Sequence, residues 1–166
     1  KMDSKDIIIM LNECLTLLSA VIDDFEGVID KYEGDRIMTL FGAPLETKNH
    51  ELQATLCAIE MQRALAVWNA SREASGYIKL EVGIGIHAGE AVAGNVGAEN
   101  HLSYTVLGPF VNVTSRVCDF AEARETLITK EVLEKTKDHI EYEEKPAQKF
   151  KGVSEPVVTY SVLKKK

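Results

Sequence analysis

The sequence predicts an α+β fold, and three patterns in its 166 residues support this prediction. Apolar residues recur at helical spacing across residues 3–25 and again across 49–70, which is typical of two amphipathic helices. Residues 27–41 resemble a β-hairpin with its turn at Glu33-Gly34. Residues 80–86 alternate with a period of two, as a strand does. Helices and strands mixed in this way indicate one α+β domain over residues 1–166.

Beyond residue 86 the chain predicts shorter elements. Gly89, Gly94 and Gly97 interrupt it and predict short, irregular pieces. Gly108-Pro109 predicts a turn before the next helix. The expected strands are 104–107, 126–129, 139–149 and 159–163, and the expected helices are 110–121 and 130–137.

Composition excludes several classes of function. The hydrophobic fraction of 45% and the charged fraction of 27% are ordinary for a globular domain. A net charge of −7 argues against a nonspecific nucleic-acid binder. No apolar run reaches membrane-spanning length, so any membrane anchor would lie outside this chain. Three widely spaced cysteines without a CxxC motif predict buried free thiols in a reducing, cytoplasmic compartment.

Two local patterns around the strand at 80–86 point to a site, although each also has an ordinary structural explanation. Gly83 and Gly85 occupy one face of the strand, which predicts that another element packs unusually close. Asn112 and Arg116 are four residues apart near the start of a helix, where they suit a phosphate but are also typical of a solvated face. There is no P-loop, and Ala88 leaves the pattern GxGxxG incomplete.

Longer motifs favour the functional interpretation. The segments GIGIHAGEAVAGNVG (83–97), YTVLG (104–108) and VNVTSR (111–116) follow one another, DKYEGDRIMTLFGAP (30–44) precedes them, and FKG (150–152) comes last. In content, order and spacing they resemble the catalytic domain of the class III adenylyl and guanylyl cyclases over almost the whole chain. The resemblance implies a ferredoxin-like topology, an antiparallel sheet with helices packed on it. It gives His87 no catalytic role, and a histidine on a strand is more often structural.

The resemblance assigns the substrate-binding and metal-binding positions. Asp35, after the turn glycine, would bind one of two catalytic divalent ions, Mg²⁺ or Mn²⁺. Lys31 and Thr105 would contact the purine ring, and this lysine–threonine pair is the adenine type, which favours ATP over GTP. A threonine hydroxyl can accept a hydrogen bond from the adenine amino group.

The resemblance also assigns the groups that act on the phosphates. Asn112 would orient the ribose and Arg116 would stabilise charge at the α-phosphate. Lys151 would hold the leaving pyrophosphate. In this family the site forms at a dimer interface, so a homodimer would have two equivalent sites.

Two departures from the family pattern affect this expectation. The family begins with a strand of the pattern FxDIxGFT that bears the other metal aspartate, and this strand is absent from the chain. Its absence should leave a missing ligand and a gap in the core. His101 stands where the family often has a phosphate-binding arginine. Because a neutral imidazole binds phosphate less well than a guanidinium, we predict a weaker hold on ATP.

The leading hypothesis is the catalytic domain of an adenylyl cyclase that acts in intracellular signalling, joined to regulatory domains in a larger protein. Such a protein would be cytoplasmic or would present this domain on the cytoplasmic side of a membrane. One alternative is a guanylyl cyclase. The other is a degenerate cyclase-homology domain that binds a nucleotide or dimerises without catalysis.

Overall fold

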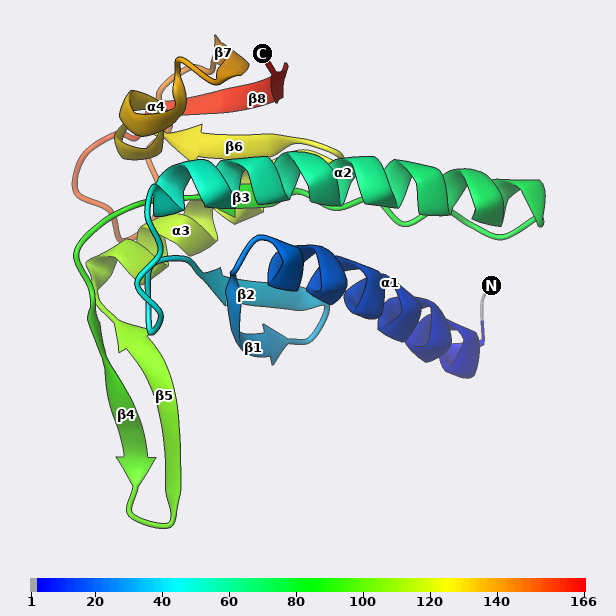
Figure 1. Cartoon of the computed structure of the whole chain (residues 1–166), viewed down its shortest axis with the longest axis horizontal. Coiled ribbons are helices and arrows are strands. Elements are labelled where there is room, and N and C mark those ends of the chain that lie inside the picture. Colours follow the sequence, from blue (N-terminus) through cyan, green and yellow to red (C-terminus); the bar gives the residue numbers. More distant parts are fainter. Residues whose placement is uncertain (1–2) are drawn as a thin grey trace.

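The computed structural model describes residues 3–166 and confirms the α+β class (Figure 1). Within these residues the helices are α1 (Ser4–Asp24), α2 (His50–Ala74), α3 (Pro109–Phe120) and α4 (Lys130–Thr136). The strands are β1 (Val28–Glu33), β2 (Arg36–Leu40), β3 (Ile84–Ile86), β4 (Val92–Ala98), β5 (His101–Leu107), β6 (Thr126–Thr129), β7 (Ile140–Glu144) and β8 (Thr159–Lys165).

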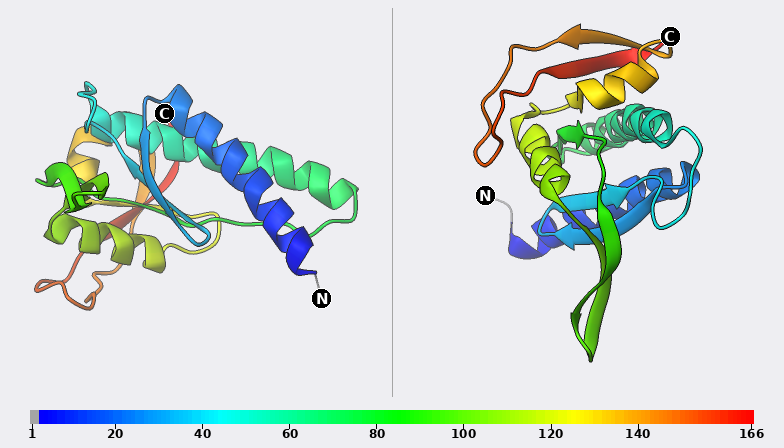
Figure 2. Two further views of the ribbon diagram at one scale, coloured as in Figure 1. Left: turned by 90° about the horizontal axis from the view of Figure 1, so that it is seen from below. Right: turned by 90° about the vertical axis from the view of Figure 1, so that its left-hand side faces the viewer.

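The strands lie in three separate sheets, where a single antiparallel sheet was expected. The largest sheet has the order β3-β6-β8-β7, in which β3 runs parallel to β6 and the other pairs are antiparallel. Strands β1 and β2 form a hairpin beside α1 (Figure 1). Strands β4 and β5 form a second, longer hairpin that projects away from the body of the domain as an arm (Figures 1 and 2).

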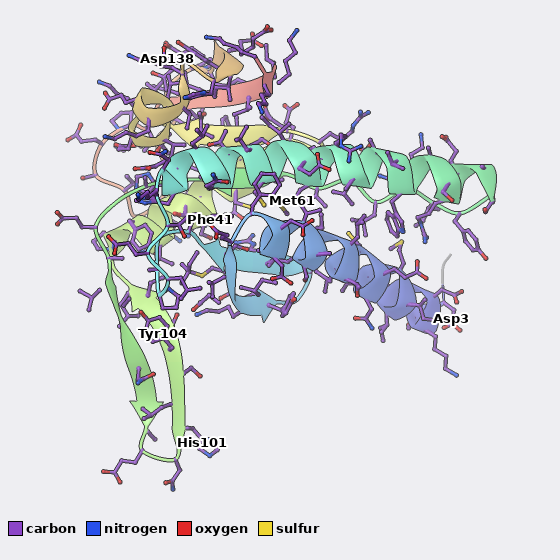
Figure 3. All side chains as sticks on the ribbon, viewed as in Figure 1. Asp3, Phe41, Met61, His101, Tyr104 and Asp138 are labelled. Carbon is purple, nitrogen blue, oxygen red and sulfur yellow. The ribbon has the colours of Figure 1, made fainter. Side chains whose placement is uncertain are left out.

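Helix α2 lies at the centre of the domain, between α1 on one side and the four-stranded sheet with α4 on the other. Phe41 and Met61, labelled in Figure 3, belong to the core between the β1–β2 hairpin and α2. The buried residues of the α1–α2 layer are Cys14, Leu18, Val21, Ile22, Cys57 and Leu65, and those of the α4–sheet layer are Ile128, Val132, Leu133, Ile140 and Tyr160.

The strand expected over residues 80–86 forms only at its end, as β3. Residues 80–83 have no neighbouring strand in the described chain. Side chains of α2 instead form hydrogen bonds with backbone groups of this segment. Asn69 accepts from the Leu80 N–H at 2.9 Å and donates to the Leu80 carbonyl at 2.8 Å. Gln62 donates to the Val82 carbonyl at 2.9 Å. Three backbone groups of this segment are therefore hydrogen-bonded to α2 although the segment belongs to no sheet.

The glycine-rich segment after β3 differs most from the prediction, because β4 forms a regular seven-residue strand. Its partner β5 begins at His101, three residues earlier than predicted. Glycine and alanine have low strand propensity, so the local sequence does not reveal a strand that depends on its partner. Two other ends shift by several residues: α2 extends to Ala74 rather than to residue 70, and β7 ends at Glu144 rather than at residue 149.

The expectation of free thiols is confirmed. Cys14 and Cys57 are buried and Cys118 is half-buried, and none of them forms a disulfide. Among residues 3–166, no helix combines the length and apolar character needed to cross a bilayer.

Candidate active site

A groove with a cavity volume of about 880 Å³ separates β2 from β3. The edge of β2 opposite β1 and the edge of β3 opposite β6 have no strand partner among residues 3–166. Much of the wall is apolar, with Leu15 and Ile22 from α1 and Ile37 from β2. A gap in the core was expected from the absence of the family's first strand, and this groove lies between two unpaired strand edges.

Asp35 lies at the mouth of this groove, on the turn of the β1–β2 hairpin. Glu33 pairs with Arg36, so the turn consists of two residues, and Gly34 adopts a left-handed φ of 66° that favours glycine. The carboxylate is exposed. The hairpin turn therefore presents Asp35 where it can reach a bound ion or phosphate.

Lys31 and Thr105 come together through a residue that the sequence analysis did not single out. The Thr105 hydroxyl donates to Asp30 Oδ2 at 3.0 Å, and Lys31 Nζ lies 3.2 Å from the same oxygen. Thr105 is buried, whereas Lys31 remains 41% exposed in its side chain. Two residues that are 74 positions apart thus meet at one carboxylate.

Asn112 and Arg116 lie on consecutive turns of α3, as their spacing predicted, and both are exposed. Pro109 occupies the first turn of the helix, where its missing N–H is not needed. Asn112 also lines the groove together with Lys31 and Asp35. The groove therefore unites three of the predicted site residues, and Arg116 follows one turn further along the helix.

One ion pair and one hydrogen bond, both made by Arg36, join the hairpin to α3 beside these residues. Arg36 donates to Asp119 Oδ1 at 2.6 Å and to Ser115 Oγ at 3.0 Å. Arg116 donates to the other oxygen of Asp119 at 3.2 Å. Asp119 therefore links Arg116 to the strand that follows Asp35. Nothing in the sequence distinguishes Arg36 or Asp119 from ordinary surface charges, so sequence reasoning missed both.

Two predicted residues stand apart from this group. His101 lies at the tip of the arm (Figure 3), four strand residues or roughly 13 Å from Thr105. Lys151 is exposed in the turn after Phe150, whose ring packs at 5.9 Å from that of Phe120 at the end of α3. The loop of Lys151 is thus held near α3, but no contact joins either residue to the groove.

His87 has a structural environment, in line with the decision not to assign it a catalytic role. Its Nδ1 is 2.9 Å from the Thr129 hydroxyl and 3.6 Å from a Glu131 carboxylate oxygen. Burial lowers the pKa of His87, and the Glu131 charge offsets this only in part. The imidazole links the end of β3 to the end of β6.

The described residues 3–166 contain no cluster of three or more His, Cys, Asp or Glu side chains that would hold a metal ion. Asp35 is the one carboxylate among the predicted site residues. Magnesium is commonly bound by one or two carboxylates together with substrate phosphates and water. The exposed Asp35 fits such a site as one ligand, and the phosphates and a second carboxylate would have to supply the rest.

Comparison with known proteins places this geometry in a family. A family model described as the adenylate and guanylate cyclase catalytic domain matches residues 1–164. Adenylate cyclase 1 of Rhizobium meliloti strain 1021 is 32% identical over 161 residues, which is 96% of this chain and 24% of that protein. An uncharacterized protein of Mycobacterium tuberculosis is 35% identical over 119 residues, 72% of this chain and 20% of its own length. The chain thus spans a quarter or less of these relatives.

Solved structures agree. The adenylyl cyclase CyaB from P. aeruginosa superposes with a TM-score of 0.94 at 31% identity, over 100% of this chain and 86% of that one. The guanylyl cyclase Cya2 superposes with a TM-score of 0.91 at 34% identity, over 97% of this chain and 82% of that one. Because the family model covers nearly every residue and the fold agrees, the chain belongs to the family of adenylate and guanylate cyclase catalytic domains.

Proposed function

We propose that this domain converts ATP to cyclic AMP and pyrophosphate. The observation that supports ATP is the meeting of Lys31 and Thr105 at one buried carboxylate. A lysine donor beside a threonine hydroxyl suits the ring nitrogen and amino group of adenine. This pairing has the chemistry that the family uses to select adenine.

In the proposed reaction the ribose 3′-oxygen attacks the α-phosphorus and pyrophosphate leaves. Such a phosphoryl transfer depends on positioning and on neutralisation of charge. Asn112 orients the ribose and Arg116 stabilises charge at the α-phosphate, while Lys151 and His101 hold the terminal phosphates. Two divalent ions, Mg²⁺ or Mn²⁺, would supply activation of the 3′-oxygen and neutralisation of the phosphates. Asp35 is the ligand that this chain offers them.

We further propose that the active form is a homodimer. The arm exposes apolar side chains on both faces, among them Val92 at 75%, Leu102 at 57% and Leu107 at 53%. An isolated two-stranded hairpin is marginal in water, so a second copy that covers the arm would stabilise it. The position of His101 at the arm tip, away from the groove, also suits a site shared between two subunits.

The first experiment measures cyclic AMP from ATP and cyclic GMP from GTP, with Mn²⁺ and at high protein concentration. It uses the 166-residue chain and a version extended at its N-terminus by a strand of the pattern FxDIxGFT, which the groove between β2 and β3 can receive. Asp35→Ala should abolish the activity and leave the melting temperature unchanged. Asp138→Ala removes an exposed carboxylate far from the groove and should retain full activity (Figure 3).

The shared site has its own test. Within one chain Asp35 and Arg116 lie near the same groove, but we propose that the two act across the dimer, as the family resemblance implies: one subunit supplies Asp35 and the other supplies Arg116. Asp35→Ala and Arg116→Ala should each be inactive alone. When they are mixed, half of the dimers contain one intact site, so about a quarter of the wild-type activity should return. No recovery from variants that exchange subunits would count against a shared site.

Two other functions have some support. The likeness to Cya2 favours GTP as a substrate, and cyclic GMP in the first experiment would establish it. The absence of a cluster of three or more metal-binding side chains among residues 3–166 favours a domain that binds a nucleotide without catalysis. If a folded dimer of the N-terminally extended version made no cyclic nucleotide from ATP or from GTP, this result would support the second alternative. Three free thiols support a cytoplasmic location for any of these functions.

A further inference from the structure

Asp30 is a buried carboxylate whose presence the packing of the fold does not explain. Its side chain is 1% exposed. Oδ2 accepts the hydrogen bond from Thr105 and lies 3.2 Å from Lys31 Nζ, whereas Oδ1 is buried with no partner. A buried polar atom without a hydrogen-bond partner destabilises the fold. Such an atom beside two substrate-binding residues indicates a role toward the substrate.

A β-bulge brings Asp30 to this position. Ile29 pairs with Thr39 and Lys31 pairs with Met38, so Asp30 is an extra residue in β1 without a partner in β2. Consecutive side chains of a regular strand point to opposite faces, and a bulge breaks this alternation. The contact between Lys31 and Asp30, which are neighbours in β1, depends on this bulge. The bulge thus places a carboxylate and an ammonium together opposite Thr105.

The contact with Asp30 fixes the direction of the Thr105 hydroxyl. A hydroxyl has one hydrogen, and Thr105 donates it to Asp30 Oδ2. The Thr105 oxygen can then act only as an acceptor toward any further group. Lys31 Nζ has three hydrogens and can act only as a donor. Because Asp30 Oδ2 accepts from the Thr105 hydroxyl and lies beside the Lys31 ammonium, Asp30 holds Thr105 as the acceptor and Lys31 as the donor toward a bound base.

This arrangement matches adenine and opposes guanine. Adenine presents an amino donor at position 6 beside an acceptor ring nitrogen, and guanine presents a carbonyl acceptor at position 6 beside an N–H donor. We infer that Asp30 is a positioning residue that determines base specificity, by keeping the Thr105 hydroxyl an acceptor for the adenine amino group. The inference rests on the proposed function and extends it to a residue outside the family's purine-binding pair.

The test is Asp30→Asn, with the ratio of kcat/KM for ATP to that for GTP as the readout. The asparagine amide has the same size but can donate to Thr105 Oγ1, which frees the hydroxyl hydrogen to reach the guanine carbonyl. The ratio should fall about tenfold or more, the equivalent of one hydrogen bond. If Asp30 had a purely structural role, Asp30→Asn would lower kcat/KM for ATP and for GTP together and would leave their ratio unchanged. Asp24→Asn, an exposed carboxylate at the end of α1, should leave both values unchanged.

A second variant keeps the inference testable if Asp30→Asn does not fold. Thr105→Val removes the hydroxyl but retains the β-branched shape of β5, and it should lower the same ratio. In the double variant the ratio should fall no further than in Thr105→Val, because both changes remove one interaction. An unchanged ratio in Thr105→Val, or fully additive effects, would overturn the inference.

Failure of the proposed function can be recognised separately. If the wild type makes no cyclic nucleotide, dissociation constants for ATP and GTP from titration calorimetry replace the kinetic values. A preference for ATP in binding that Asp30→Asn removes would still support the role of Asp30 in a domain without catalysis. A preference for ATP that survives Asp30→Asn would overturn it.

Discussion

Gly85 of β3 lies directly beneath the backbone of Cys118 in α3. A Cβ atom on Gly85 would overlap the Cys118 amide nitrogen and would lie 2.6 Å from its Cα. Two residues before Gly85, a Cβ on Gly83 would lie 2.8 Å from the carbonyl oxygen of Ala121, the residue that follows α3. The glycine face of this strand therefore lets α3, and with it Asn112 and Arg116, approach the sheet closely.

Gly85→Ala should destabilise the domain. The added methyl group meets backbone atoms, which cannot rotate away as a side chain can, so α3 and β3 must separate. Overpacking of this kind costs about 1–3 kcal/mol, which lowers the melting temperature of a domain this size by roughly 2–10 °C. Thermal unfolding followed by circular dichroism measures the shift.

Gly94→Ala in β4 is the matched control, since nothing lies within 4 Å of a Cβ there and its φ is not left-handed. Its melting temperature should stay within about 1 °C of the wild type or rise slightly, because alanine reduces the entropy of the unfolded chain. An equal loss of stability in both variants would show that the close approach of α3 at Gly85 is not responsible.

The contact between Gly85 and Cys118 also shows what the sequence predicts well. Close packing on the glycine face followed from the period of two, and the placement of Asn112 and Arg116 followed from their i, i+4 spacing in a helix. Both are local properties, determined by strand and helix geometry. The prediction failed at β4, because a strand rich in glycine is specified by its partner and not by its own residues.

The contacts that join distant segments lay beyond prediction from one sequence. Asp30 meets Thr105 across 75 positions, and Arg36 meets Asp119 across 83. No periodicity relates such residues, since only the tertiary fold brings them together. Asp30 did have one weak signal, as the residue next to Lys31, but in a regular strand neighbouring side chains point to opposite faces. The bulge in β1, which interrupts this alternation at Asp30, is not visible in the sequence.

The ion pair of Arg36 and Asp119 should contribute little to stability despite its short distance. The two side chains are 39% and 40% exposed, so water and salt screen the attraction. A double-mutant cycle with Arg36→Ala and Asp119→Ala should give a coupling energy of at most about 1 kcal/mol, which decreases at 1 M NaCl. Urea unfolding of the four proteins measures it. A coupling of several kcal/mol, insensitive to salt, would contradict this expectation.

Cys57 should be unreactive in the folded protein. Burial raises its pKa to about 12, so almost none of it is the reactive thiolate at pH 8. Iodoacetamide at pH 8 should leave Cys57 unmodified in the native state and should modify it in 8 M urea, as peptide mass spectrometry would show. Cys14 should behave likewise, because it is 1% exposed and burial raises its pKa. Rapid native-state modification of Cys57 would mean that the core between α1 and α2 opens readily.

His87 should make the domain less stable in mild acid. Burial lowers its pKa below the ordinary 6.5, so near that pH the unfolded chain binds a proton that the folded chain does not. Stability therefore falls as the pH drops from about 7.5 to 5.5, and His87→Gln should lose less over this range while it retains a hydrogen-bonding group for Thr129. Urea unfolding at a series of pH values measures the slope, and NMR titration of the imidazole locates the midpoint directly. A midpoint at or above 6.5, or equal slopes in the two proteins, would mean that the charge of Glu131 outweighs burial at this site.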